Sequence, residues 1–191
     1  AVNGLVHPDN IWKNSGAQPG DRLILTKPVG SAVIFNANLK KRVSREAMDA
    51  CITIVSGLNR IAAETALAFD IHAATDVTGF GLAGHAFEMA RGSGMRIIID
   101  MQHLPIMDQA LDMYQQGVST AKNAPNREQV KPYMRFDIDL PPWHEEIVFD
   151  PQTSGGLLLS LPAPQSDALC QALKDAGVAH AAIIGAVEAR E

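Results

Sequence analysis

The sequence has 191 residues, of which 47% are hydrophobic and 19% charged, and its formal net charge is −5 at pH 7. This composition is typical of one globular domain, or one domain with an appended piece, and excludes a disordered chain. The acidic balance argues against a nucleic-acid partner, and no apolar run approaches the ~18 residues of a membrane span. Cys51 and Cys170 form no zinc-binding or redox pattern, so a reducing cytoplasm is the expected location.

The first residues, 1–6, read as the end of a strand and contain no initiator methionine. We therefore expect the chain to be a fragment of a longer protein, with a processed N-terminus as the alternative. Residues 7–20 follow as a loop, because proline, glycine and asparagine are concentrated there.

Apolar patterning predicts strands and helices alternating along the rest of the chain. A continuous apolar run predicts a buried strand over 22–26. Steps of three and four predict a helix over 44–69, divided near Gly57, with a buried stripe. That stripe comprises Met48, Cys51, Ile52, Val55, Leu58, Ala62 and Ala66. Further strands are expected at 71–75, 95–101, 156–161 and 181–187, and further helices at 79–91, 105–116 and 164–176. Residues 117–142 are expected to be irregular and mobile, with one short helix around 127–133. The fold class is therefore α/β or α+β, in layers.

A glycine-rich turn lies between a predicted strand and a predicted helix. It has the pattern Gly79-x-Gly81-x-x-Gly84, and Asp100 closes the next strand, 21 positions after Gly79. This arrangement is typical of a dinucleotide-binding turn with an acidic residue for the ribose. A dinucleotide-binding domain is thus one interpretation.

Asp76 favours a second interpretation, because it stands three residues before the first glycine, at the exit of the strand. An unpaired carboxylate pointing into the turn would repel a bare pyrophosphate, unless a divalent cation lies between them. Mg²⁺ is typically held by one or two carboxylates together with substrate phosphates and water. The turn therefore fits a metal–nucleotide site, with Thr78 as a hydroxyl ligand or a helix cap. A third interpretation is structural, with Asp76 and Thr78 as capping residues and the glycines serving tight packing.

A second loop, Asp150-Pro-Gln-Thr-Ser-Gly-Gly156, contains an acid, two hydroxyl groups and adjacent glycines. Such a segment can turn backbone N–H groups toward an anion, although a polar turn before a buried strand is the alternative. Two glycine-rich acidic loops in one small domain favour phosphate chemistry. His85 reads as a packed or capping histidine, residues 143–146 as a solvated helix start, and no histidine spacing indicates zinc.

Together the two loops resemble the signature segments of the selenophosphate synthetase (selenide, water dikinase) family. The segments are Asp76-Val-Thr-Gly-Phe-Gly-Leu-Ala-Gly-His85 and Asp150-Pro-Gln-Thr-Ser-Gly-Gly-Leu-Leu158. Leu25-Thr-Lys-Pro-Val-Gly30 is similar to the family's entry into its C-terminal domain, and Gly4-Leu-Val-His-Pro8 to the preceding strand and linker. The resemblance implies that residues 1–19 are the last strand of an N-terminal domain plus a linker. It implies that residues 20–191 form the C-terminal domain, with a mixed sheet and packed helices as in aminoimidazole ribonucleotide synthetase-like enzymes.

The resemblance also implies a reaction, in which ATP, selenide and water give selenophosphate, AMP and phosphate, with Mg²⁺ and in a homodimer. Asp76 occupies the place of a family Mg²⁺ ligand. Thr78 and Gly79 would line the phosphate side, with Thr153, Ser154, Gly155 and Gly156 from the second loop.

One departure from the family pattern concerns the catalytic residues. The family's nucleophilic cysteine or selenocysteine, its partner lysine and its other metal-binding aspartates lie in an N-terminal half that this sequence lacks. Neither Cys51 nor Cys170 has the nucleophile's glycine-rich setting, so we identify no catalytic residue and expect the chain to be inactive alone. The alternative from another functional class is a non-catalytic binding or dimerisation module, in which both loops are structural turns.

Overall fold

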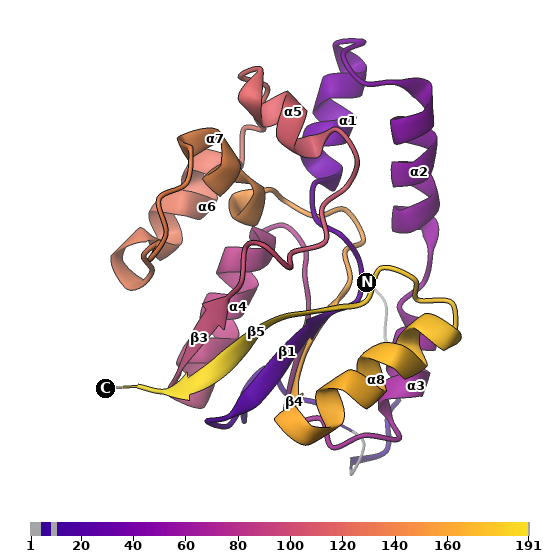
Figure 1. The fold of residues 1–191 in the computed structure, drawn as a ribbon, viewed down its shortest axis with the longest axis vertical. Coiled ribbons are helices and arrows are strands. Elements are labelled where there is room, and N and C mark those ends of the chain that lie inside the picture. The colour runs from indigo at the N-terminus through magenta and orange to yellow at the C-terminus, as the bar shows by residue number, and fades with distance from the viewer. Residues whose placement is uncertain (1–4, 9–10, 191) are drawn as a thin grey trace.

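The computed structural model describes residues 5–8 and 11–190, which form a five-stranded sheet with helices packed against it (Figure 1). The strand expected at the start of the chain falls mainly on residues 1–4, which lie outside the described residues. The strands are β1 (Asp21–Leu25), β2 (Ala73–Asp76), β3 (Met95–Ile99), β4 (Leu157–Pro162) and β5 (Ala182–Ala189). The α-helices are α1 (Ser31–Leu39), α2 (Arg45–Ser56), α3 (Arg60–Ala66), α4 (Gly81–Ser93), α5 (Ala110–Gln115), α6 (Asn123–Val130), α7 (Pro142–Glu145) and α8 (Ala163–Asp175). Two 3₁₀ turns follow α6 and α7: η2 (Lys131–Tyr133) and η3 (Glu146–Phe149).

The sheet has the order β2-β4-β1-β5-β3, and its four strand pairings are antiparallel within the part of the chain that the structure describes. The layered α/β arrangement is confirmed. The sheet itself is antiparallel rather than mixed, although an isolated parallel bridge joins Val29 to Ile106 beside it. Antiparallel neighbours place the end of one strand next to the start of its partner. This register decides which loops meet.

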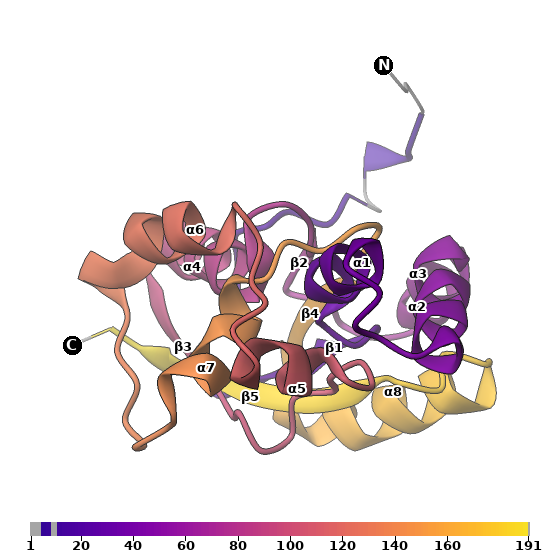
Figure 2. The same ribbon diagram turned by 90° about the horizontal axis from the view of Figure 1, so that it is seen from above.

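The central strands are buried on both faces, which explains their continuous apolar runs. In β1, Leu23 and Leu25 belong to the larger core cluster, whereas Ile24, between them, belongs to the smaller one. Helices α8 and α3 cover the smaller cluster, and α4 covers the larger one together with α6 and η3 (Figure 2). None of the helices in the described residues is long and apolar enough to cross a membrane.

Most predicted elements are confirmed within a few residues, including the division of the 44–69 helix at Gly57. The predicted buried stripe of that helix was partly wrong, because Ile52 and Leu58 are 44% and 80% exposed. The helix predicted from residue 105 begins only at Ala110. Residues 105–107 instead pair with Val29, whose N–H donates to the carbonyl of Pro105 and whose carbonyl accepts from Met107.

Helix α1 was not predicted, and the irregular region over 117–142 contains more helix than expected. The residues of α1 are apolar on several sides, with Val33, Ile34 and Ala37 all buried, so no amphipathic stripe marks it. Helix α6 begins at Asn123, four residues before the expected start, and Asn123 and Asn126 are buried. Hydrogen bonds from these buried amides to other segments anchor this part of the chain.

Candidate functional site

Three loops meet at one end of the sheet because of the antiparallel register. Leu25 at the end of β1 pairs with Leu158, and Asp76 at the end of β2 pairs with Leu157. The segments after β1 and β2 therefore lie beside the segment before β4. The two loops selected from the sequence begin at Asp76 and Asp150, 74 positions apart, and are neighbours in space.

Backbone hydrogen bonds join the two loops directly. The N–H of Val77 donates to the carbonyl of Gly156 at 2.9 Å, and the N–H of Gln152 donates to the carbonyl of Thr78 at 2.9 Å. A Cβ on Gly155 would overlap the carbonyl oxygen of Val77, and one on Gly156 would overlap the backbone nitrogen of Lys27. Both glycines are buried and permit this close approach. Gly155 and Gly156 therefore lie beneath the surface of the junction between the two loops.

The outer surface of the junction carries the remaining residues predicted for the site. Asp76, Gly79, Thr153 and Ser154 are exposed, and Thr78 is half-buried. The Asp76 carboxylate accepts no hydrogen bond from the described residues, so it is available to a cation. The described residues contain no group of three or more His, Cys, Asp or Glu side chains that could hold a metal ion. A Mg²⁺ ion here would need phosphates, water or other ligands to complete its shell.

Lys27 adds a positive charge to this junction, although the sequence pattern did not mark it as a site residue. Its ammonium donates to the carbonyls of Ser154 at 2.8 Å and Gly57 at 2.6 Å. Burial lowers the pKa of Lys27 below its ordinary value. Asn59 donates to the carbonyl of Gly155 at 2.9 Å, so both side chains hold the second loop in place.

The acid of the second loop does not face the junction. Asp150 is fully buried, and its carboxylate accepts hydrogen bonds from the N–H groups of Ala32 at 3.1 Å and Val33 at 3.0 Å. The Gln152 side-chain oxygen accepts from the N–H groups of Gly30 and Ser31. These two side chains satisfy the N–H groups at the start of α1, which an anion would otherwise bind. Burial raises the pKa of Asp150 to about 7, against the opposing effect of its hydrogen bonds.

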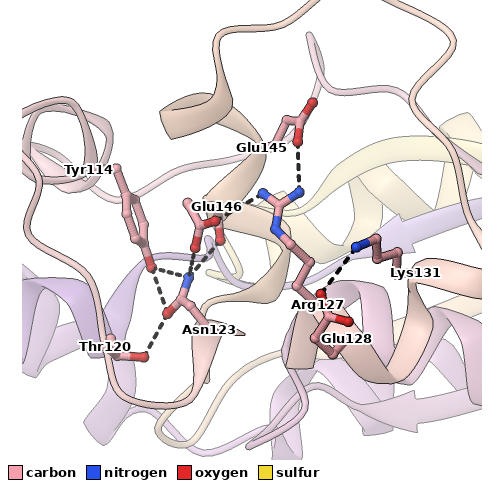
Figure 3. Close-up of polar contacts among 8 residues, drawn as sticks. All are labelled: Tyr114, Thr120, Asn123, Arg127, Glu128, Lys131, Glu145 and Glu146. Carbon is pink, nitrogen blue, oxygen red and sulfur yellow. Dashed lines mark hydrogen bonds and ion pairs between the residues drawn. The ribbon is translucent and has the colours of Figure 1, made fainter. Parts of the chain in front are cut away.

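A polar network supports Asp150 from the other side, where Tyr114 donates to its carboxylate at 2.6 Å. The Asn123 amide in turn donates to the Tyr114 hydroxyl at 3.0 Å and to Glu146 at 2.8 Å (Figure 3). Arg127 forms ion pairs with Glu145 at 2.8 Å and Glu146 at 2.9 Å. The expectation of a solvated helix start over 143–146 is confirmed for the helix, since α7 spans Pro142–Glu145, but wrong for the solvation, because both glutamates are partly buried against Arg127. No local sequence pattern could have indicated this network, whose members come from separate elements.

His85 lies beneath the glycine turn and is only 6% exposed. Its Nε2 is 3.2 Å from the Thr78 hydroxyl oxygen, and its Nδ1 is 3.4 Å from a carboxylate oxygen of Glu88. Burial lowers the pKa of His85, although the nearby carboxylates of Glu88 and Asp76 oppose the effect. The prediction of a packed histidine is confirmed, and its hydroxyl partner belongs to the site.

The topology does not support the dinucleotide-binding interpretation. That fold needs parallel strands on either side of the turn and helix, whereas β2 and β3 lie at opposite edges of an antiparallel sheet. Gly81 has a positive φ of 70° and lies against the backbone of residues 148–150, and a Cβ on Gly84 would meet Phe80. Asp100 follows β3 and pairs with His103 at 2.7 Å. Local packing therefore accounts for Gly81 and Gly84.

Neither cysteine has the properties of a nucleophile. Both are free thiols and both are buried. Burial, with the nearby Asp150 carboxylate, raises the pKa of Cys51 to about 11. The Cys170 thiol donates to the carbonyl of Ala181 at 3.4 Å. A reactive thiol would need a lowered pKa and access to solvent.

Comparisons with known proteins give a consistent result. The family model described as AIR synthase related protein, C-terminal domain, matches residues 18–191. The chain is 39% identical over 194 residues to selenide, water dikinase 2 of Peptoclostridium acidaminophilum, covering 100% of the chain and 55% of that protein. It is 42% identical over 191 residues to the selenide, water dikinase of Desulfitobacterium hafniense strain Y51, again covering 100% of the chain and 55% of the relative. The chain thus spans about half the length of the curated relatives it matches.

Solved structures show the same fold at low sequence identity. The hydrogenase maturation protein HypE in complex with ATP superposes with a TM-score of 0.65 at 19% identity, over 96% of this chain and 47% of that one. Thiamine-monophosphate kinase from Stenotrophomonas maltophilia K279a gives a TM-score of 0.65 at 18% identity, over 97% of this chain and 53% of that one. At this level of identity the likeness concerns the fold alone.

Proposed function

The chain belongs to the AIR synthase related protein family, whose C-terminal domain it forms, and we propose that it is the C-terminal half of a selenide, water dikinase. The reaction is the conversion of ATP, selenide and water into selenophosphate, AMP and phosphate. The names of relatives at 39–42% identity support this assignment, since the matches extend over the whole chain. The observation that carries it is the convergence of both signature loops at one end of the sheet.

We assign the nucleotide's phosphate side to the junction of the two loops. Asp76 is an exposed carboxylate without a hydrogen-bonding partner in the described residues, which suits a Mg²⁺ ligand. A bound Mg²⁺ would neutralise phosphate charge and orient the transferred group. Thr78, Gly79, Thr153 and Ser154 lie in the two loops that backbone hydrogen bonds join, and Gly155 and Gly156 allow these loops to approach each other closely. Lys27 adds a positive charge beside Ser154.

The nucleophile and the remaining metal ligands would come from an N-terminal half, because Cys51 and Cys170 are buried inside this domain. We propose that the complete enzyme is a homodimer. The two free, buried thiols support a reducing cytoplasm as its location. The domain by itself would be inactive, with residues 1–19 as the last strand and linker of the preceding domain.

Substitution of Asp76 in the full-length protein tests the proposal. Asp76→Asn should lower selenide- and Mg²⁺-dependent ATP turnover by orders of magnitude while the thermal unfolding temperature stays unchanged, because the side chain is exposed. Asp139→Asn, which changes another exposed carboxylate, is the matched control and should retain activity. Wild-type turnover in Asp76→Asn would remove this residue from the site.

The inward-facing Asp150 and Gln152 favour a second candidate, a non-catalytic module in which both loops are structural turns. It predicts no effect of Asp76→Asn on the chemistry of the full-length protein. Calorimetric titration of the 191-residue chain with Mg·ATP gives a further test. Binding should be weak without the other ligands, and micromolar affinity would contradict the proposed division of the site between two halves.

A further inference from the structure

The short link between α2 and α3, residues 57–59, lies against the second loop. The carbonyl of Gly57 accepts a hydrogen bond at 2.6 Å from the Lys27 ammonium, which also donates to the second loop. The Asn59 side chain donates to the carbonyl of Gly155 at 2.9 Å. The α2–α3 link is therefore fixed beside the junction of the two loops.

Apolar side chains on this link and on the helices beside it are left in solvent. Leu58 is 80% exposed, and Ile61 in the first turn of α3 and Ile52 on α2 are each 44% exposed. Cys51 and Ala62, which belong to the same predicted stripe, are buried. Figure 2 shows α2 and α3 together at one edge of the molecule. The apolar stripe is therefore wider than the surface that the described residues cover.

Leu58 has a fixed position in solvent, because both of its neighbours in the chain, Gly57 and Asn59, are hydrogen-bonded to other segments. Burial of so exposed a leucine would be favourable, since apolar surface gains free energy on leaving water. Arg60 and Glu64 form an ion pair beside it, at side chains that are 72% and 63% exposed. An apolar centre with a charged rim is the usual composition of a protein interface.

The course of the segment before β1 indicates what reaches this surface. The N–H of Ala74 in β2 donates to the carbonyl of Lys13 at 2.8 Å, and a Cβ on Gly16 would lie 2.8 Å from the carbonyl oxygen of His72. Residues 13–16 thus run antiparallel along the outer edge of β2. Followed backward, from Gly16 to Lys13, they lead toward Asp76. Chain that precedes them approaches the domain at the end of the sheet where the two loops meet.

The matched relatives are about twice as long as this chain, which covers 55% of each. We propose that the N-terminal half of the same polypeptide packs on Leu58 and Ile61, beside the junction. The inference rests on the proposed function, which supplies that half as the source of the nucleophile and the remaining metal ligands. It deepens the proposed function by assigning the surface that joins the halves. Because Lys27 and Asn59 tie this surface to the second loop, docking would also fix the loop that faces the phosphates.

Leu58→Cys, made both in the 191-residue chain and in the full-length protein, tests this interface. The measurement is the rate of alkylation by iodoacetamide at position 58, followed by peptide mass spectrometry. The rate should be about tenfold or more slower in the full-length protein, because packing removes both solvent access and thiolate character. Leu39→Cys, at a leucine that is 83% exposed at the end of α1, is the matched control and should react equally fast in both proteins.

Equal alkylation rates at position 58 in the two proteins would overturn the inference. Protection of position 58 in the 191-residue chain that increases with protein concentration would also overturn it, because the occupant would then be a second copy of this domain. Selenide-dependent ATP turnover separates this result from the proposed function. A full-length protein that protects position 58 but lacks turnover would retain the interface and lose the function, whereas turnover with free alkylation would retain the function alone.

Discussion

The hydroxyl of Tyr114 donates a 2.6 Å hydrogen bond to the buried carboxylate of Asp150. This contact joins α5 to the loop that caps α1, and it lies at the inner side of the junction between the two signature loops. Burial and the Asp150 carboxylate raise the pKa of Tyr114, so the tyrosine is a permanent donor. The hydrogen bonds of Asp150 therefore hold the second loop in position, and the ionisation of Asp150 makes the stability of the domain depend on pH.

The free energy of unfolding should decrease as the pH rises from about 4 to about 7 because of Asp150. Its pKa is raised from 3.8 to about 7 in the folded chain, so the folded state retains a proton that the unfolded state has released in this window. The contribution is fully favourable below the unfolded pKa and is lost as the pH rises through the folded one. Each pKa unit corresponds to ~1.4 kcal/mol, so the loss is on the order of a few kcal/mol. Urea unfolding curves measured at several pH values, compared with those of Asp150→Asn, should show a smaller slope in the variant.

Tyr114→Phe should shift the pH range over which the free energy of unfolding decreases to higher values. The tyrosine hydroxyl stabilises the ionised carboxylate, so its removal should raise the pKa of Asp150 further. The variant should also be less stable by about 1 kcal/mol, the usual net contribution of one hydrogen bond. Tyr133→Phe, at an exposed tyrosine on η2, is the control and should leave the pH profile unchanged. A profile identical to that of the wild type in Tyr114→Phe would contradict the assigned coupling.

Gly155→Ala should destabilise the domain by roughly 1–3 kcal/mol, the cost of an added methyl group in a packed site. Its Cβ would overlap the carbonyl of Val77, so the two loops would have to separate. Gly79→Ala is the matched control, because a Cβ there meets nothing within 4 Å and the φ angle of Gly79 is not positive. The free energy of unfolding of that variant should stay within ~0.5 kcal/mol of wild type. Similar losses for the two variants would show that the close loop approach is not the cause.

Arg127→Met should cost roughly 1–3 kcal/mol, because it leaves two partly buried carboxylates without their partner. Glu145 and Glu146 are 21% and 26% exposed, and the guanidinium also lies 4.3 Å above the ring of Phe149. Arg127→Lys should recover only part of this loss, since an ammonium cannot bind both carboxylates as a planar fork does. Chemical denaturation measures the effect. Arg60→Ala, which breaks an exposed pair with Glu64, should change stability by at most ~0.5 kcal/mol.

The thiol of Cys51 should be unreactive in the folded chain. Its pKa is raised to about 11 from 9.0, so at pH 8 the thiolate fraction falls by about a hundredfold, at one factor of ten per pKa unit. The rate of alkylation by iodoacetamide in a Cys170→Ser variant, folded and in urea, isolates this thiol. Equal rates in the two conditions would contradict its burial. In the full-length enzyme, Cys51→Ala and Cys170→Ala should both retain turnover.

The sequence by itself determined the elements whose signals are local. The apolar run before Thr26, the steps of three and four across α2 and α3, and the glycines around α4 all act through neighbouring residues. The chemistry of the two loops is local in the same sense, because an acid, hydroxyls and glycines follow one another in each. The layered fold class, the presence of α4 and the family resemblance could therefore be predicted.

Only the tertiary structure decided which way the polar groups of those loops face. Asp150 and Gln152 point inward to the start of α1, whose first N–H groups lie about 120 residues earlier in the chain. Helix α1 was not predicted for the same reason. The side chains that cap its first N–H groups are distant in the sequence, and its residues are buried on several sides, so no amphipathic stripe marks it. Long-range packing satisfies buried polar groups with partners that no local pattern contains, and this is why the outward role of Asp76 and the inward role of Asp150 look alike in the sequence.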